Sequence, residues 1–391
     1  MKLSDRVNAL AESATLAVSS KAAAMKKEGI DVVSFGAGEP DFDTPANVKE
    51  AGKKAIDEGK TRYATPASGI LPAKEAVCSK LKRENDLTYE PSQVLITVGG
   101  KEALFLAFSA IVNPGDEVLL PSPYWVSYPE QIKLCGGKVV YLAGDEANSF
   151  KLKPEQIAAA ITPRTRVLVM NYPSNPGGFC YAPEDIRAIA EIVVRHDIVV
   201  FSDEMYDRLL YGNQRFLSFA AAHPDAYRKT ITFNAGSKTY SMTGWRIGYA
   251  AGPKEIIGAM AKLQSQTTSG PATFNQWALA EALNGDQSSV EKMRREFERR
   301  AEYMHRRLNA IPGVKCVQPT GAFYAFPNVS GTYRKLGVSG SLEFASKVLE
   351  QAKVALVPGI AFGSDAHVRL SFATSMEQIQ KGLDRLAEFL A

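Results

Sequence analysis

Short apolar runs alternate with amphipathic segments along the first two thirds of the chain. The runs VLIT, VLLP, VLVM and IVVF are each followed within three residues by Gly, Pro, Asn or Asp. Segments with apolar residues at helical spacing lie between them, for example 183–196. Strands that alternate with helices predict a mostly parallel sheet. Because the loops after parallel strands meet at one edge of the sheet, we expect a ligand site there.

The pattern changes after residue 288. Residues 288–308 are dense in Glu, Arg and Lys at helical spacing, which predicts a long, solvated helix that links two domains. The segments 313–327 and 353–363 favour strands, and 375–390 has the period of an amphipathic helix. We interpret this last third as a smaller α+β domain.

The fold class that these patterns indicate is α/β, with a large domain over residues 45–288 built on a mostly parallel central sheet. A chain of 391 residues is too long for one small core, so a second domain is expected. We assign residues 13–44 and 289–391 to it. Residues 1–12 form a polar N-terminal arm, which usually becomes ordered only by docking on another surface, such as a partner subunit.

Composition narrows the function classes. Lys and Arg number 46 against 42 Asp and Glu, without a basic run, which argues against a nucleic-acid partner. No apolar run is long enough for a membrane span, and the N-terminus lacks a signal-peptide pattern. The four cysteines are isolated, which favours a reduced, cytoplasmic protein. The four histidines are scattered, which argues against a zinc site, so we expect no metal.

The segment 233–250, FNAGSKTYSMTGWRIGYA, contains the strongest candidate chemistry. Lys238 lies among small and hydroxyl residues, with apolar residues just beyond. A lysine held out of bulk water loses proton affinity, as it must to form a Schiff base with an aldehyde cofactor. Arg246 is expected two helical turns downstream, and a guanidinium is a natural partner for phosphate. Taken singly, a surface lysine and a solvated arginine in a loop are the better interpretation, and only the motif as a whole favours the chemistry.

Two glycine turns are candidates for anion binding. Gly36 and Gly38 follow a short apolar run and leave backbone amides free to approach a ligand, although an ordinary tight turn explains them equally well. Gly99 and Gly100 precede an apolar helix. Their amides and that of Lys101 would lie at the helix N-terminus, where the helix dipole favours phosphate.

Two charged residues lie in or next to apolar strands. Asp203 follows the run IVVF, where a carboxylate is costly to bury unless it is paired, and a protonated pyridine nitrogen is a suitable partner. Tyr206 follows one turn later; a helix cap and a core tyrosine are the alternative interpretations. Arg369 in HVRLSFA alternates with Val368 and Leu370, and strand arginines often point to solvent.

The segments SKTYSMTGWRIGY, AGEPDF, GGK, NYPSNPGG, SDEMYDR and RLSFA together resemble the signatures of the class I/II aminotransferases, the fold-type I pyridoxal 5′-phosphate (PLP) enzymes. They occur in the family's order, and the resemblance covers nearly the whole chain. It implies PLP as the cofactor, amino acids and 2-oxo acids as substrates, and a homodimer with shared active sites. It also implies a large domain and a smaller α+β domain.

The resemblance also implies a role for each matching residue. The catalytic residues would be Lys238, Asp203 and Tyr206. The cofactor-binding residues would be Gly99, Gly100, Lys101, Trp125, Asn175, Asp203, Tyr206, Ser237, Lys238 and Arg246. Tyr63 would reach across the dimer interface to the PLP phosphate of the other subunit. The substrate-binding residues would be Gly38, Trp125, Asn175, Arg369, Lys101 and Thr15.

The segments EPDFDTP, PYWVSYPE and MTGWRIGY are similar to the Iγ subgroup of bacterial aspartate aminotransferases. The resemblance implies transfer of an amino group between L-aspartate and 2-oxoglutarate by a ping-pong mechanism. No Arg or Lys lies between Lys262 and Lys292, which leaves Lys101, near Thr15, as the candidate for the distal carboxylate. Alternatives are a broad aromatic or prephenate aminotransferase, a C–S β-lyase, and a non-enzymatic PLP-binding regulator. Some relatives have a lysine that is associated with prephenate use, and Ala11 stands at that position here.

Overall fold

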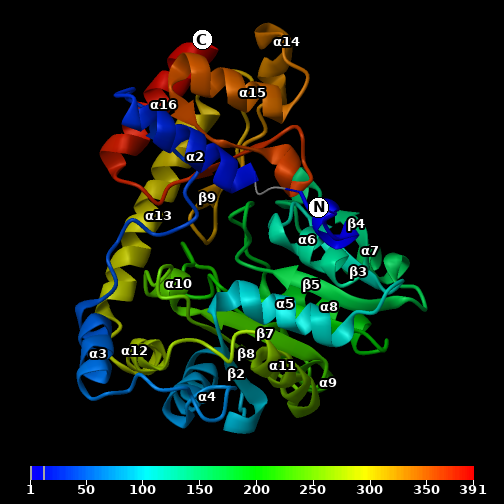
Figure 1. The fold of residues 1–391 in the computed structure, drawn as a ribbon. Helices are drawn as coiled ribbons and strands as arrows, with labels where there is room; N and C mark the ends of the chain where they lie inside the picture. The colour runs from blue at the N-terminus through cyan, green and yellow to red at the C-terminus, as the bar shows by residue number, and fades with distance from the viewer. Residues whose placement is uncertain (1, 12–13) are drawn as a thin grey trace.

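A twisted sheet forms the centre of the lower half of the molecule in Figure 1. The computed structural model describes residues 2–11 and 14–391. Within that part of the chain, the sheet has seven strands in the order β2-β8-β7-β6-β5-β3-β4. Their bounds are β2 Val94–Thr97, β3 Glu117–Ser122, β4 Lys138–Ala143, β5 Thr165–Asn171, β6 Val199–Asp203, β7 Thr230–Ala235 and β8 Gly248–Ala251. Strand β8 runs opposite to the other six strands, which all point the same way, so the predicted mostly parallel sheet is confirmed.

Helices cover both faces of this sheet because the strands are apolar on both faces. Along β2, Val94 and Ile96 pack on one side with α3, α4 and α12, whereas Leu95 packs on the other with α5, α6 and α11. The helices are α3 Ala46–Asp57, α4 Leu71–Asn85, α5 Gly99–Ile111, α6 Ser127–Leu134, α7 Pro154–Ala160, α8 Pro183–Val193, α9 Pro224–Tyr227, α10 Gly236–Thr239, α11 Lys254–Gln266 and α12 Thr273–Asn284.

The second layer lies above the sheet and joins the two ends of the chain (Figure 1). Its elements are α2 Ala14–Lys27, β1 Val33–Ser34, β9 Tyr324–Ala325, α14 Tyr333–Leu336, α15 Ser341–Lys347, β10 Val354–Ala355, β11 Val357–Pro358, β12 Val368–Ser371 and α16 Met376–Leu390. Strand β1 pairs with β10, and β12 pairs with both β11 and β9. The strands are shorter than the sequence indicated, because Pro and Gly interrupt both segments, for example at Pro358 and Gly359.

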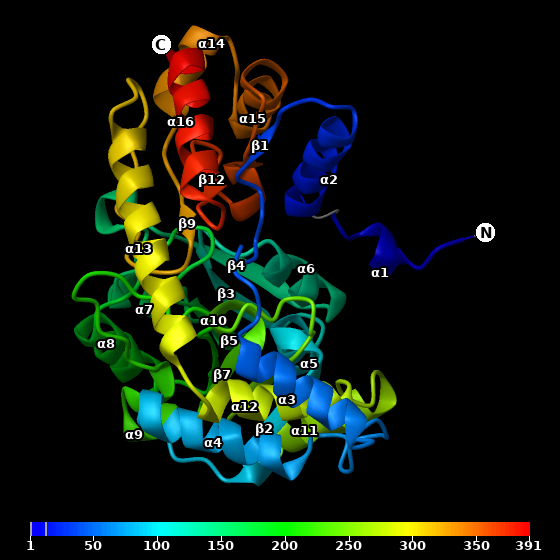
Figure 2. The same cartoon turned by 90° about the vertical axis from the view of Figure 1, so that its left-hand side faces the viewer.

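Helix α13 (Ser288–Asn309) spans the two layers, as Figure 2 shows. The predicted long helix is therefore confirmed, but the expectation that it is solvated is wrong for one face. Residues such as Met293, Phe297 and Met304 are buried on that face because they recur every three or four positions among the charges.

The N-terminal arm contains the short helix α1 (Asp5–Asn8), which has no buried residue. The Ala11 amide donates to Glu130 Oε2 at 3.0 Å. The expected boundary between arm and small domain, at residues 12 and 13, lies outside the described residues, and the domain bounds stay a prediction. Among the helices that the structure describes, none is long and apolar enough to cross a bilayer.

Candidate active site

The loops that follow the parallel strands open into a cavity of about 620 Å³ at the boundary of the two layers. Most of the predicted site residues line it: Thr15, Gly38, Gly100, Lys101, Trp125, Asn175, Asp203, Tyr206, Ser237, Lys238, Arg246 and Arg369. Two predicted residues lie elsewhere. Gly99 lies behind the wall against Arg246, and Tyr63 is 88% exposed in the loop between α3 and α4.

Lys238 lies in α10, directly after β7, and its amine donates a hydrogen bond to the carbonyl oxygen of Gly38. The side chain is half-buried. Burial, together with the positive charges of Arg369 and Arg246 and against the opposing charge of Glu39, lowers the pKa of Lys238 to about 8. About one tenth of such amines are uncharged at pH 7, far more than for an ordinary lysine, and the uncharged form is the one that acts as a nucleophile or a base.

Arg246 is not separated from Lys238 by two helical turns, so that expectation is wrong. Helix α10 ends at Thr239, and the chain then turns with a positive φ of 50° at Arg246 itself. Its Nη1 donates to the Thr243 carbonyl oxygen at 2.9 Å. A Cβ at Gly99, where φ is +77°, would lie 2.7 Å from Arg246 Nη2. The guanidinium therefore packs on the start of α5 only because residue 99 has no side chain.

Asp203 is buried at the carboxyl end of β6, where its Oδ1 accepts from the Met205 amide at 3.3 Å. Burial raises the pKa of Asp203 to about 6, against the effect of a hydrogen bond from the Tyr128 hydroxyl. The sequence interpretation missed Tyr128. The available signal was an aromatic residue three positions after Trp125, which places both side chains on one side of a helical turn.

Arg369 is 2% exposed and does not point to solvent. Its Nη1 donates to Asn175 Oδ1 at 3.1 Å, its Nη2 donates to the Gly36 carbonyl oxygen at 3.0 Å, and its guanidinium carbon lies 4.6 Å from the ring centre of Tyr324. Nε is buried without a partner in the described part of the chain. A buried, incompletely paired guanidinium beside a cavity is suited to bind a carboxylate.

Tyr206 and Tyr324 meet at the back of the same cavity, with their hydroxyl oxygens 3.0 Å apart. Tyr324 was also missed, because GAFYAFP resembles an ordinary buried strand. On the opposite side, Lys101 Nζ lies 5.1 Å from the ring centre of Trp125. Burial, with a smaller effect of Arg246, lowers the pKa of Lys101.

These residues fit PLP. Arg246 and the first turn of α5, where Gly100 and Lys101 line the cavity, offer a guanidinium and a helix N-terminus to a phosphate. Trp125 offers an aromatic face to a ring, and Asp203 a buried carboxylate to a ring nitrogen. For metals, the described residues contain no group of three or more His, Cys, Asp or Glu side chains that could hold an ion.

Residues 30–386 match the family model described as aminotransferase class I and II. This chain belongs to the aminotransferase class I and II family. Members of this family depend on PLP, so the predicted family, fold type and cofactor are confirmed.

Three relatives illustrate how close the similarity of this aminotransferase is. An aspartate aminotransferase of Geobacillus stearothermophilus is 47% identical over 390 residues, which cover 100% of this chain and 99% of that protein. An aspartate/prephenate aminotransferase of Cereibacter sphaeroides is 46% identical over 395 residues, which cover 100% of this chain and 98% of that protein. The crystal structure of the aspartate aminotransferase from Rhizobium meliloti superposes with a TM-score of 0.95 at 42% identity, covering 100% and 99% of the two chains.

Proposed function

We propose that this protein is an aspartate aminotransferase that moves the amino group of L-aspartate to 2-oxoglutarate, giving oxaloacetate and L-glutamate by a ping-pong PLP mechanism. One observation carries the proposal: a lysine with a lowered pKa, a buried carboxylate and a buried, incompletely paired arginine face a single cavity. The full-length similarity to proteins named aspartate aminotransferase supports the choice of substrate.

The cofactor would be held at three points. Arg246, Ser237 and the amides at the start of α5 would bind the phosphate, Trp125 would offer its face to the ring, and Asp203 would pair with the ring nitrogen. When bound, PLP supplies an aldehyde that joins the substrate amine and a ring that takes up the electrons of the Cα–H bond. Tyr206, which lines the same cavity, would donate to the phenolic oxygen of the ring.

The substrate would be oriented by its α-carboxylate. Arg369 donates from two nitrogens of its guanidinium, and Asn175, which already pairs with Arg369, adds a side-chain donor. Lys238 Nζ then lies within the same cavity as a general base. With the cofactor bound, Lys238 would accept the proton from substrate Cα and carry it to the cofactor, a role for which a pKa near the working pH is favourable.

Lys101 is the proposed contact of the distal carboxylate, with Thr15 and Trp125 beside it in the cavity wall. Removing a charge that contacts a carboxylate costs about 1.5–3 kcal/mol, or about ten-fold to a hundred-fold. Lys101→Ala should therefore raise the KM for aspartate by that factor and leave the KM for alanine nearly unchanged. An unaltered KM for aspartate would remove Lys101 from this role.

A panel of amino acids tests the activity as a whole. Aspartate with 2-oxoglutarate should give oxaloacetate faster than aromatic donors or prephenate give their products, and borohydride should attach the cofactor at Lys238. Prephenate is the second candidate because relatives carry the name aspartate/prephenate aminotransferase. Release of ammonia and thiol from sulfur amino acids would instead identify a C–S β-lyase.

We also propose a homodimer with shared active sites. Two observations support it: Tyr63 is 88% exposed and lies outside the cavity of its own chain, and the arm exposes Leu3 and Val7. Sedimentation should give twice the mass of 42.4 kDa. Tyr63→Phe should weaken cofactor binding, as removal of a phosphate contact would. The cytoplasmic location stays a prediction, and nothing in the geometry favours a non-enzymatic regulator.

A further inference from the structure

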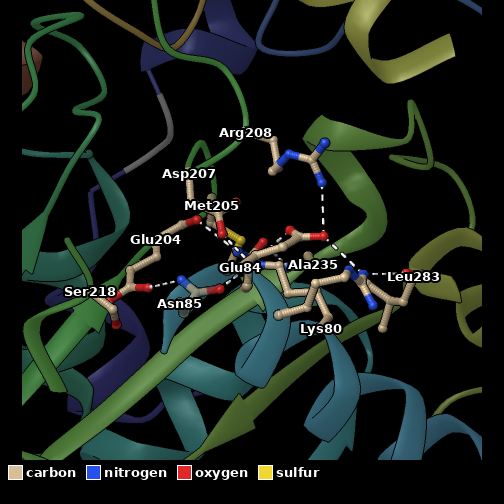
Figure 3. A network of polar contacts seen from close by, with 12 residues as sticks. Lys80, Glu84, Asn85, Glu204, Met205, Asp207, Arg208, Ser218, Ala235 and Leu283 are labelled. Carbon is tan, nitrogen blue, oxygen red and sulfur yellow. Dashed lines mark hydrogen bonds and ion pairs between the residues drawn. The ribbon is translucent and has the colours of Figure 1, made fainter. Parts of the chain in front are cut away.

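The segment from Asp203 to Arg208 contacts the cavity with some of its side chains and helix α4 with others. Asp203 and Tyr206 line the cavity. Three other residues of the segment contact the C-terminal part of α4 instead: Glu204 contacts Asn85, Asp207 contacts Lys80, and Arg208 contacts Glu84. Figure 3 shows these contacts from close by.

Lys80 is the centre of this cluster, which we call the α4 network and define as Lys80, Glu84, Asn85, Glu204, Asp207 and Arg208. The side chains of Lys80 and Asp207 form an ion pair and are only 3% and 4% exposed. Lys80 Nζ also donates to Asn85 Oδ1 at 2.7 Å. Because an ammonium group can only donate, the Asn85 oxygen must face Lys80, and Nδ2 then donates to Glu204 Oε2 at 3.2 Å. The network therefore has a fixed donor direction from Lys80 to Glu204.

Glu204 extends the network to the strands beside the cavity. Its Oε1 accepts from Ser202 Oγ at 2.8 Å and Ser218 Oγ at 2.6 Å. Its backbone oxygen accepts from Asn234 Nδ2 at 2.8 Å, and its amide donates to the Phe233 carbonyl oxygen at 2.9 Å. Both of those partners lie in β7, the strand that leads directly to Lys238.

The network holds the turn that presents the cavity residues. The Asp207 amide donates to the Glu204 carbonyl oxygen at 3.1 Å, and the Leu209 amide donates to that of Tyr206 at 2.8 Å. Asp207 is the immediate neighbour of Tyr206, so a shift of the Asp207 backbone moves the Tyr206 backbone with it. Lys80 is thus linked to the cavity through one side chain and one peptide unit.

Stability alone is a weak reason for such a network. Buried ion pairs pay a large desolvation cost, and apolar residues of the same volume often serve stability as well or better. A buried network with fixed donors and acceptors holds its residues in a single geometry. This matters for catalysis, because a misplacement of about 1 Å at a reacting group can lower the rate roughly a hundred-fold.

We propose that Lys80, Asn85 and Asp207 are positioning residues, which fix the turn from Asp203 to Leu209 so that Asp203 and Tyr206 meet the cofactor in one orientation. The proposal rests on the proposed aminotransferase function for its effect on turnover, but its effect on the turn does not require a cofactor.

Lys80→Met, Asp207→Ala and Asp207→Asn test this role. The asparagine keeps the size of Asp207 and an oxygen for Lys80, so it should restore part of what alanine loses and remains informative if Lys80→Met does not fold. Glu117→Gln is the matched control. Glu117 is also buried and pairs with Arg164, at 2.9 Å, but it lies at the first residue of β3, at the opposite edge of the sheet from the cavity.

Two measurements are made on each variant. In the cofactor-free protein, hydrogen exchange at the Asp207 and Leu209 amides should be about ten-fold faster or more for Lys80→Met and Asp207→Ala, and unchanged for Glu117→Gln. In the PLP-loaded enzyme, kcat should fall about ten-fold to a hundred-fold, with the KM for aspartate within about three-fold, because Arg369 and Asn175 are untouched. The pH midpoint of the visible absorption band should also shift.

The outcomes separate the two proposals. Unchanged exchange at these amides, or faster exchange with wild-type kcat and an unshifted band, would overturn the positioning role. The positioning role would also be overturned if the Lys80 and Asp207 variants lost activity only in proportion to their loss of folded protein, as the control Glu117→Gln does. If the wild-type protein neither binds PLP nor transaminates while exchange is accelerated as expected, the proposed function fails and the control of the turn by the α4 network stands.

Discussion

The hydroxyl of Tyr128 holds the Asp203 carboxylate in its charged form, and Tyr128→Phe removes this one oxygen. Tyr128 is 1% exposed and Asp203 is 4% exposed, so water does not replace the lost donor. Burial already raises the pKa of Asp203 to about 6 in the wild-type protein. Without the hydroxyl, the Met205 amide at 3.3 Å and the positive charge of Lys238 still oppose that effect.

The size of the change follows from the bond that is lost. A hydrogen bond to a charged group contributes about 1.5–3 kcal/mol. Since about 1.4 kcal/mol corresponds to one pKa unit, the pKa of Asp203 should rise by about one to two units. At pH 7 the ionised fraction of Asp203 then falls from about nine tenths to between about a half and a tenth. At pH 9 it stays close to complete in both proteins.

The assay is the affinity of the cofactor-free protein for PLP at pH 7 and pH 9, followed by absorbance. If an ionised Asp203 is needed to pair with the ring nitrogen, Tyr128→Phe should bind about two-fold to ten-fold more weakly at pH 7 and nearly normally at pH 9.

Tyr181→Phe is the control, because Tyr181 is equally buried and accepts from the Leu152 amide, away from Asp203. It should bind PLP normally at both pH values. The same loss of affinity at pH 7 and pH 9 for Tyr128→Phe, or no loss at either, would refute the reasoning.

Two further substitutions test the walls of the cavity. Arg369→Lys replaces a buried, two-pronged guanidinium by a single ammonium group, so kcat/KM for aspartate should fall about ten-fold to a hundred-fold in steady-state kinetics. A decrease below about three-fold would contradict the assigned contact. Gly99→Ala combines a φ of +77° with a Cβ 2.7 Å from Arg246 Nη2, so it should weaken PLP binding about five-fold or more in a direct titration. Gly115, the control position, has a similar φ of +92° but open space around it, so Gly115→Ala should lower the melting temperature without affecting PLP affinity. Equal losses of PLP affinity in the two variants would contradict the steric account.

The order of short apolar runs and turns determined the architecture. Strands buried on both faces need apolar residues at consecutive positions, and this requirement is visible in a single sequence at β2, β5 and β6. Most of the chemistry was also local, because Asp203 ends a strand, and Gly100 and Lys238 lie in the first turn of a helix. Loops at the ends of parallel strands converge, so these residues could be expected in one cavity.

The tertiary structure decided which side chains modify that chemistry. Tyr128 and Asp203 are 75 residues apart, and Asn85 and Glu204 are 119 apart. Their contact depends on how α6 and α4 pack on the sheet, which no local pattern records. The same holds for Gly99, whose missing side chain matters only because the turn after α10 returns Arg246 to the start of α5. Local propensity therefore determined the strands and the reactive residues, whereas packing between distant segments set their pKa values and orientation.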